Sequence, residues 1–379
     1  MRGDILFYKF ECKIKTDVTF KTFINTELKS FEFDNFSVDK FKSSINLIYN
    51  GINIGVSKWL SPKRSGSGAM AKVYDTLHLN KRLAIIPIRK DEGFCSGHSI
   101  ISPTTSSWMS LFNVYIVLAY FDKAIKNENY KNKLKNQEYN NDFVREEIKK
   151  IMSFQGDAHQ WNETLFRTRM WEIHRKSIDA YRRIAETTGV KVTEMGILSD
   201  KYDYDRDLKM RYELAKKAAL RETQTVHENE RLNSKFKGFL NISDCLGGQY
   251  YLTCDEIFEI GENKYLIQES KNSTSEVLPT VAEIKEVLLK MYLFSNIDEI
   301  RLKRKKVDAN FRIKLTSESM IGKLYLKDST SKYEIEEFIK SNKLSKSRRN
   351  LIYGLHKEVL HNNFTIIIQN SSTQEDLDI

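Results

Sequence analysis

The stretch from Thr253 to Lys271 constrains the fold of this chain most, because it has the pattern of two strands joined by a tight turn. Two short β-prone runs flank a Gly-Glu-Asn tripeptide, which is typical of a hairpin with a three-residue loop. If Ile260 pairs with Lys264, this register sets Asp255 opposite Glu269 near the open end of the hairpin.

Two directly opposed carboxylates repel each other, and this repulsion destabilises a hairpin unless something compensates it. A divalent cation between Asp255 and Glu269 would do so. Side chains alternate along a strand, so Lys271 projects to the same face as Glu269. The pattern therefore predicts two acids and an ammonium at one end of the hairpin. The alternative is a solvated strand face, since most charged residues of a strand are exposed.

An acid, a short spacer and then acid-x-Lys at the end of the next strand resembles the PD-(D/E)XK nucleases, which include most type II restriction endonucleases. The matching residues are Asp255, Glu269 and Lys271, and Cys254 stands where the name-giving proline often lies. The resemblance implies that the two acids bind Mg²⁺, a metal that prefers hard oxygen ligands. It also implies that the lysine orients or helps to deprotonate the attacking water, leaving a 5′-phosphate.

Many members of that family carry a further metal-side acid on the helix before the first core strand. A long charged helix is expected here from Tyr204 to about Phe236, and it contains Glu228 and Glu230. Either residue could complete a metal site, and both could equally face solvent.

The residues after the hairpin predict an α/β arrangement in which a helix covers the sheet. Thr280 and Glu283 form a capping box, the helix runs to about Ser295, and two strands follow at Glu299–Lys303 and Phe311–Leu315. Residues 204–325 are thus expected to form a restriction-endonuclease-like mixed sheet core flanked by helices. Five basic residues are expected beside the site as phosphate contacts, with a solvated strand end as the alternative: Arg301, Lys303, Arg304, Lys305 and Lys306.

Residues 1–203 are expected to form an α+β region with a structural or DNA-binding role. The expected strands are Ile5–Ile14, Val18–Ile24, Ile45–Val56 and Leu83–Ile88, and the expected helices are Trp108–Lys126 and the stretch Asp142–Ala185. The residues between these elements are expected to form a glycine-serine connector at Lys63–Lys72, a charged turn at Arg89–Gly93 and an exposed loop at Asn127–Asn141.

Residues 326–370 are expected to form a separate helix-turn-helix-like unit, with a strand behind it as in winged helices. Its helices are Tyr333–Ser341 and Ser345–His361, and the strand is Phe364–Gln369. The second helix begins with Lys346, Arg348 and Arg349, which are candidate DNA contacts. An ordinary helical hairpin is the alternative, and residues 371–379 are a polar tail.

The composition is that of a globular protein with a polyanionic partner. Sixty-one basic residues against 51 acidic ones give a net charge of +10, which favours nucleic-acid binding. The four cysteines lack the spacing of a zinc site or of a disulfide framework, and the N-terminus lacks a signal-peptide pattern. A cytoplasmic protein without a membrane span is therefore expected.

These observations favour a Mg²⁺-dependent, sequence-specific endodeoxyribonuclease similar to type II restriction endonucleases. Its expected partner is double-stranded DNA. A homodimer is expected if the target is palindromic, and a companion DNA methyltransferase is expected for a restriction system. Two alternatives stay open: a nucleic-acid-binding protein without catalysis, and a repair or junction-resolving nuclease on the same fold.

Overall fold

The computed structural model describes residues 8–15, 18–59, 69–93, 98–99, 108–192, 236–243 and 249–373, and these form two compact units. Unit 1 combines Met1–Asn25 with Ala215–Ile379, and unit 2 spans Thr26–Leu214. This division differs from the expected boundary at residue 203, because the first strand pairs with strands from the C-terminal half. The expected helix Tyr204–Phe236, with Glu228 and Glu230, lies outside the described residues, apart from Phe236 itself.

The described part of unit 1 contains a nine-stranded mixed sheet in the order β15-β14-β1-β11-β12-β13-β16-β18-β17. The predicted hairpin, formed by β12 and β13, lies near the centre of this sheet. The bounds are β1 Tyr8–Ile14, β11 Phe236–Ser243, β12 Gln249–Gly261, β13 Lys264–Ser273, β14 Ile297–Leu302, β15 Lys305–Lys306, β16 Asp308–Ser317, β17 Lys323–Leu326 and β18 Thr365–Asn370.

The central strands of unit 1 form an antiparallel meander, β11-β12-β13, followed by a helical crossover to the parallel strand β16. The crossover contains α8 (Val281–Phe294), and a parallel connection of this kind needs such a helix to return the chain across the sheet. The predicted capping box is confirmed, because Glu283 N donates to Thr280 Oγ1 and Glu283 Oε2 accepts from Thr280 N. The coarse expectation of a mixed sheet flanked by helices is thereby confirmed.

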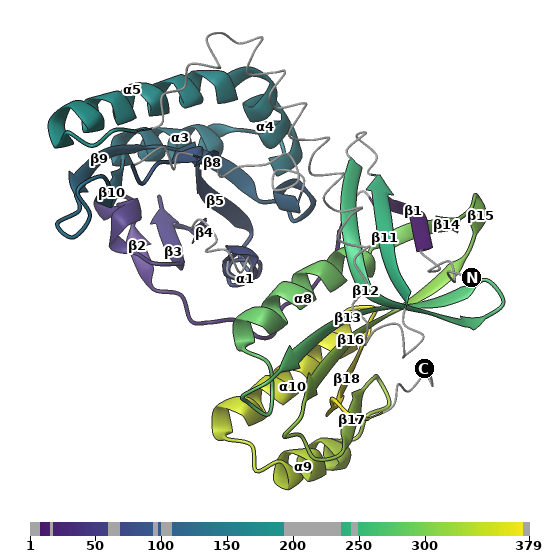
Figure 1. Ribbon diagram of the computed structural model, residues 1–379. Coiled ribbons are helices and arrows are strands. Elements are labelled where there is room, and N and C mark those ends of the chain that lie inside the picture. Colours follow the sequence, from purple (N-terminus) through teal and green to yellow (C-terminus); the bar gives the residue numbers. More distant parts are fainter. Residues whose placement is uncertain are drawn as a thin grey trace, which may run out of the picture. The chain divides into compact units, whose positions relative to one another are not determined.

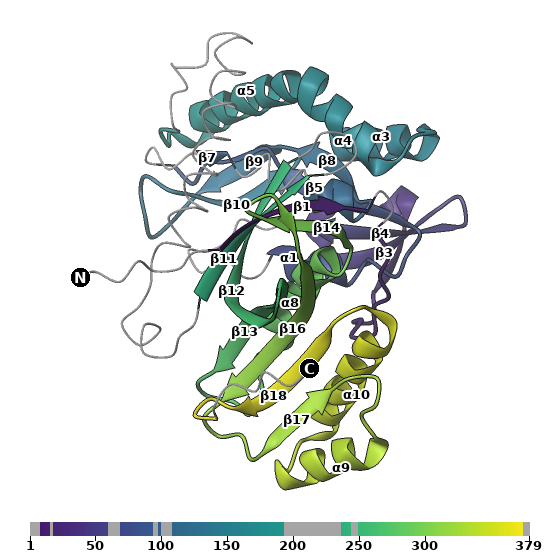
Figure 2. The ribbon, with the colours of Figure 1, turned by 90° about the vertical axis from the view of Figure 1, so that its right-hand side faces the viewer.

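The C-terminal segment completes the sheet of unit 1 instead of forming a separate domain. Its helices α9 (Lys332–Ser341) and α10 (Lys346–His361) match the expected ones, but β18 pairs in parallel with β16 and lies inside the sheet. Helix α10 also lies beside α8 (Figures 1 and 2), and Tyr292 Oη donates to Glu358 Oε2 at 2.6 Å. Three consecutive buried isoleucines in β18, Ile366–Ile368, explain this placement, because they need neighbouring strands on both sides.

The predicted strand Val18–Ile24 is not a strand in the structure. Side chains take up its backbone N–H groups instead: Thr19 N donates to Asn296 Oδ1, and Phe23 N donates to Glu358 Oε1. The alternating pattern arises because this extended segment also buries part of its side chains, without a partner strand.

Unit 2 is built on a five-stranded mixed sheet, β2-β3-β4-β5-β8, in which β4, β5 and β8 run parallel. Helices α3, α4 and α5 gather on one face, and α1 lies against the other (Figure 1). Gly55 of β4 allows the residues just after α1 to approach the sheet closely, since a Cβ there would lie 2.7 Å from Thr76 Cβ. The bounds are β2 Ser30–Glu32, β3 Ser44–Tyr49, β4 Ile52–Lys58, β5 Lys81–Pro87, β8 Tyr115–Ala119, α1 Ala69–Tyr74, α3 Asn141–Ser153, α4 Ala158–Thr164 and α5 Met170–Thr188.

The predicted helix Trp108–Lys126 is wrong over most of its length. A short helical turn is followed by β8 and then by β9 (Phe121–Lys126), which pairs with β10 (Leu134–Tyr139) in the segment expected to be a loop. Strand β8 is buried at every position, and such a continuous apolar run cannot be told from a buried helix by periodicity alone. No described helix is both long enough and apolar enough to cross a membrane.

The segment Arg89–Gly93, expected to be a charged turn, buries Arg89, Asp91 and Gly93 and leaves Glu92 exposed. Arg89 Nη2 and Asp91 Oδ2 form an ion pair at 3.1 Å, and both side chains are at most 5% exposed. Gly93 N donates to Asp91 Oδ1, and Asp91 N donates to Tyr181 Oη of α5. Contacts with residues up to 90 positions away in the sequence thus bury Arg89 and Asp91.

Candidate active site

The hairpin β12-β13 has the predicted register along its centre. Glu256 pairs with Gln268, and Glu259 pairs with Tyr265. Both pairs belong to the predicted register, which sets Asp255 opposite Glu269. The turn differs from the prediction: Gly261 pairs with Lys264, so the loop has two residues and Ile260 is an extra residue in β12. Asn263 supports this turn with a φ of 54°, a left-handed conformation that asparagine tolerates.

Asp255 lies at an irregularity of β12 that directs its carboxylate toward β13. Opposite β11, the register shifts by one residue between Cys254 and Ile257, which is a β-bulge. On the other side, Asp255 Oδ2 accepts a hydrogen bond from Ser270 N at 2.9 Å. Bulges often redirect a side chain at a functional site. Here the bulge keeps Asp255 next to the residue that follows Glu269.

The neighbouring acid, Glu256, belongs to a different, buried network. Gln268 Nε2 donates to Glu256 Oε2, Arg312 Nε donates to Gln268 Oε1 at 2.5 Å, and Lys314 Nζ lies 3.7 Å from Glu256. These four side chains are at most 8% exposed. Asp255 is thus the acid of the Asp-Glu pair that faces Glu269.

Glu269 is a buried carboxylate whose nearest described cation comes from α8. Its Oε1 lies 2.6 Å from Lys290 Nζ but makes no well-aligned hydrogen bond within the described chain. Burial raises the pKa of Glu269 to about 8, the Lys290 charge opposes this rise, and the Asp255 charge adds to it. Burial opposes the charge of Lys290, but Glu269 and Asp255 outweigh it, so the pKa of that ammonium is raised.

Lys271 approaches the same cluster from the strand side. Its Nζ lies 3.7 Å from Glu286 Oε2 of α8, and its charge lowers the pKa of Glu269 after the larger effects of burial, Lys290 and Asp255. Glu286 Oε2 is buried and has no hydrogen-bond partner in the described chain. The structure therefore brings Asp255, Glu269 and Lys271 together, as the hairpin register predicted.

Sequence reasoning missed the contribution of α8 to this site. Glu283, Glu286 and Lys290 follow the i, i+3, i+7 spacing of one helix face, next to the apolar face identified from the sequence. This spacing was a signal in the sequence that the three charged side chains lie on one face of the helix. The sequence did not reveal that the polar edge of α8 lies over the carboxylate end of the hairpin.

The donor set fits a hard divalent cation bound partly by substrate. No group of three or more His, Cys, Asp or Glu side chains within the described ranges could hold a metal by itself. Mg²⁺ usually takes one or two protein carboxylates and completes its coordination with water and phosphate oxygens. Asp255 and Glu269 match that requirement, and the Lys290 ammonium 2.6 Å from Glu269 Oε1 shows that this oxygen already accepts a cation as neighbour.

The basic cluster expected beside the site lies instead on β14 and β15, the two strands at one edge of the sheet. Arg301 is on β14, Lys303 and Arg304 form the turn into β15, and both turn residues have positive φ. Strands β1 and β11 separate β14 from β12. At about 4.8 Å per strand, β14 is roughly 14 Å from β12. The antiparallel pairing of β14 with β1 decides this position, and Lys305 and Lys306 form the exposed edge strand β15.

The candidate DNA contacts of α10 have different environments. Arg348 Nη1 donates to Pro279 O at 2.9 Å and so joins α10 to the residues just before α8. Ser345 caps the helix by accepting from Arg348 N, and Arg349 is exposed. Lys346 and Arg349 thus remain candidates for DNA contact, whereas Arg348 has a clear structural role.

No known family model matches the chain, and neither a curated protein nor a solved structure resembles it closely enough to be a match.

Proposed function

We propose that this protein is a Mg²⁺-dependent endodeoxyribonuclease similar to type II restriction endonucleases. The observation that carries the proposal is the meeting of Asp255, Glu269 and Lys271 at one end of the β12-β13 hairpin. The order of elements supports it: an antiparallel three-stranded meander, a covering helix and a strand parallel to the third. The resemblance implies a core of this general kind.

Asp255 and Glu269 are the residues that would hold Mg²⁺. When bound, Mg²⁺ supplies Lewis acidity toward the scissile phosphate and makes a water molecule more acidic. The Ser270 N–H group fixes one oxygen of Asp255, so its carboxylate keeps one orientation. The ion pair with Lys290 favours the charged form of Glu269 and keeps its carboxylate at the same end of the hairpin.

Lys271 is the residue proposed to act on the attacking water and the phosphate. An ammonium has donors only and cannot be a metal ligand. Its side chain is 32% exposed, so the ammonium can reach substrate from the same strand face as Glu269. A cation held here stabilises the charge that grows on phosphate oxygens in the transition state.

The substrate proposed for this site is double-stranded DNA, in keeping with the net charge of +10. Lys305, Lys306, Lys346 and Arg349 are proposed phosphate contacts because they are exposed. A homodimer on a palindromic target and a companion DNA methyltransferase belong to the same proposal. The structure describes one chain, and the proposed assembly follows from the symmetry of such targets.

The proposal is tested by incubating the purified protein with plasmid and phage DNA in Mg²⁺. Discrete bands are expected, and they should disappear with Asp255→Asn. Glu262→Gln is the matched control, because Glu262 is an exposed acid at the turn of the same hairpin. Structure-dependent nicking would point to a repair or junction nuclease. Absence of cutting, together with retained DNA binding in Ca²⁺, would point to a binding protein without catalysis.

A further inference from the structure

Unit 2 contains a cavity of about 610 Å³ that the proposed nuclease site does not use. Three of its lining residues follow or end the parallel strands: Trp59 comes directly after β4, Pro87 ends β5, and Phe121 begins β9 just after β8. In open α/β sheets, ligands bind at the carboxyl ends of the parallel strands. The volume is within the range of small-molecule sites.

The side chains that line this cavity are mostly cationic and aromatic. Four lysines face one acid, Glu92, and the planar groups comprise four rings. Lys90 is paired with Glu92 at 2.6 Å and Lys135 with Glu128 at 2.9 Å, whereas no carboxylate lies within ion-pair distance of Lys133 in the described chain. The lysines are Lys58, Lys90, Lys133 and Lys135, and the rings are Trp59, Phe121, Tyr130 and Tyr139.

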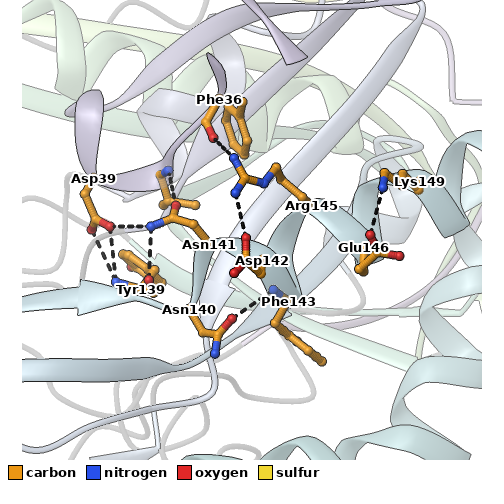
Figure 3. A network of polar contacts seen from close by, with 11 residues as sticks. Phe36, Asp39, Tyr139, Asn140, Asn141, Asp142, Phe143, Arg145, Glu146 and Lys149 are labelled. Atoms are coloured by element: carbon orange, nitrogen blue, oxygen red, sulfur yellow. Dashed lines mark hydrogen bonds and ion pairs between the residues drawn. The ribbon is translucent and has the colours of Figure 1, made fainter. Parts of the chain in front are cut away.

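The inner wall of the cavity is held rigidly. Asp39 accepts from Tyr139 N at 3.3 Å and from Asn141 Nδ2 at 2.9 Å, which joins the end of β10 to the start of α3 (Figure 3). Lys58 Nζ donates to Val38 O at 2.9 Å and lies 5.1 Å from the centre of the Tyr139 ring. This cation and ring are therefore in place before a ligand binds.

The outer wall is accessible. Tyr130 is 60% exposed, and Lys133 Nζ lies 5.0 Å from the centre of its ring. Asn136 is exposed, and its side-chain amide makes no hydrogen bond within the described residues. A flat ring, a cation and a free amide are the groups that recognise a nucleobase and its phosphate.

We propose that this cavity binds a nucleoside phosphate, either as a free nucleotide or as one nucleotide of a DNA strand. The base packs against Tyr130, and the phosphate contacts the Lys133 ammonium. The rings favour this ligand over an acidic peptide, because a planar base uses both the aromatic surface and the charge. A cavity in unit 1 balances two acids against two cations and lacks aromatic side chains, and its charged residues are Glu11, Glu299, Lys13 and Arg301.

The inference goes beyond the proposed cleavage and does not depend on it. The test uses the full chain in EDTA, where only binding is read. The first probe is a fluorescent N-methylanthraniloyl derivative of dATP, and the second is a short labelled single-stranded oligodeoxynucleotide. Tyr130→Ala and Lys133→Glu should each weaken binding of at least one probe by about tenfold. Lys131→Glu is the matched control, with the same charge change on an exposed residue that does not line the cavity.

Each outcome of this test decides the proposal. Loss confined to the dATP probe identifies a free nucleotide as the ligand, and loss confined to the oligonucleotide identifies a DNA strand. Loss for both probes identifies a nucleotide in either form. The proposal is overturned if neither probe binds the wild type, or if both pocket variants bind as tightly as Lys131→Glu. It is also overturned if polyglutamate alone binds in a manner that depends on Lys133. A negative result leaves the cleavage proposal untouched, since the assay contains no divalent ion.

Discussion

The two units each bury a carboxylate beside a cation, but they surround it differently. In unit 2, Asp91 accepts from Gly93 N at 2.9 Å and from the Arg89 guanidinium at 3.1 Å. In unit 1, Glu269 Oε1 lies close to the Lys290 ammonium without a well-aligned hydrogen bond. A buried charge with its donors in place is structural, whereas one left partly unsatisfied stores free energy that a bound cation can release.

Two segments that are similar in sequence have different environments in the two units. Arg-Lys-Asp-Glu at residues 89–92 and Glu-Ser-Lys at residues 269–271 both follow apolar strands and mix acids with a lysine. The first folds inward, because Tyr181 and Gln137 supply partners for the Asp91 backbone. The second lies where β12 bulges away from regular pairing. Whether such a segment can bind a ligand depends on which of its polar groups already have hydrogen-bond partners in the fold.

The largest expected effect is on the rate of DNA cleavage. Lys271→Ala should lower the single-turnover rate in Mg²⁺ by at least about 100-fold, because it removes a cation that acts on the transition state. DNA binding in Ca²⁺ should change little. Lys264→Ala, at the exposed turn of the same strand, is the control and should cut at the wild-type rate. Cleavage by Lys271→Ala at the wild-type rate would contradict the assignment.

A smaller effect, of opposite sign in the two units, is expected for the same chemical change. Asp91→Asn should lower the free energy of unfolding by about 3 kcal/mol, because the buried Arg89 loses its counter-charge. Glu269→Gln should instead raise the free energy of unfolding at pH 7, because the pKa of Glu269 is about 8 in the folded state and the neutral amide requires no proton to be taken up on folding. Urea unfolding of the two variants measures both values. Similar losses in the two variants would show that Glu269 is a structural residue like Asp91.

The smallest expected effect is a pH dependence that sharpens the same contrast. Burial raises the pKa of Glu269 from 4.5 to about 8, so the folded state keeps this proton longer than the unfolded state. The associated stability is fully present below pH 4.5 and is lost as the pH rises through about 8. In EDTA, the wild type should therefore lose roughly 2 kcal/mol relative to Glu269→Gln between pH 5 and pH 6.5. A constant difference between the two proteins over that range would contradict the raised pKa.

Local signals in the sequence predicted several elements of unit 1 correctly. The capping box at Thr280 and Glu283 marks the start of α8, and the β-prone runs around residues 261–263 mark the hairpin. These signals are reliable because the hydrogen bonds that make a cap or a tight turn join residues only a few positions apart. The same alternation set the hairpin register, and with it the meeting of Asp255, Glu269 and Lys271.

Long-range pairing decided what local patterns could not. The apolar run at Tyr115–Ala119 became a strand because β5 lies beside it, and β18 became part of the sheet because β16 does. The position of the Arg301–Lys306 hairpin followed from the pairing of β14 with β1. Each pairing joins segments distant in sequence, so neither segment alone contains the information.

The sequence by itself thus determined the hairpin, its register and the three side chains at its open end. Only the tertiary structure decided that α8 places Lys290 2.6 Å from Glu269 and Glu286 near Lys271. It also decided that Arg89 and Asp91 are interior residues, and that Trp59, Tyr130 and Lys133 line one cavity. The physical reason is that periodicity and turn chemistry act within a few residues, whereas burial and charge compensation depend on which distant segments pack together.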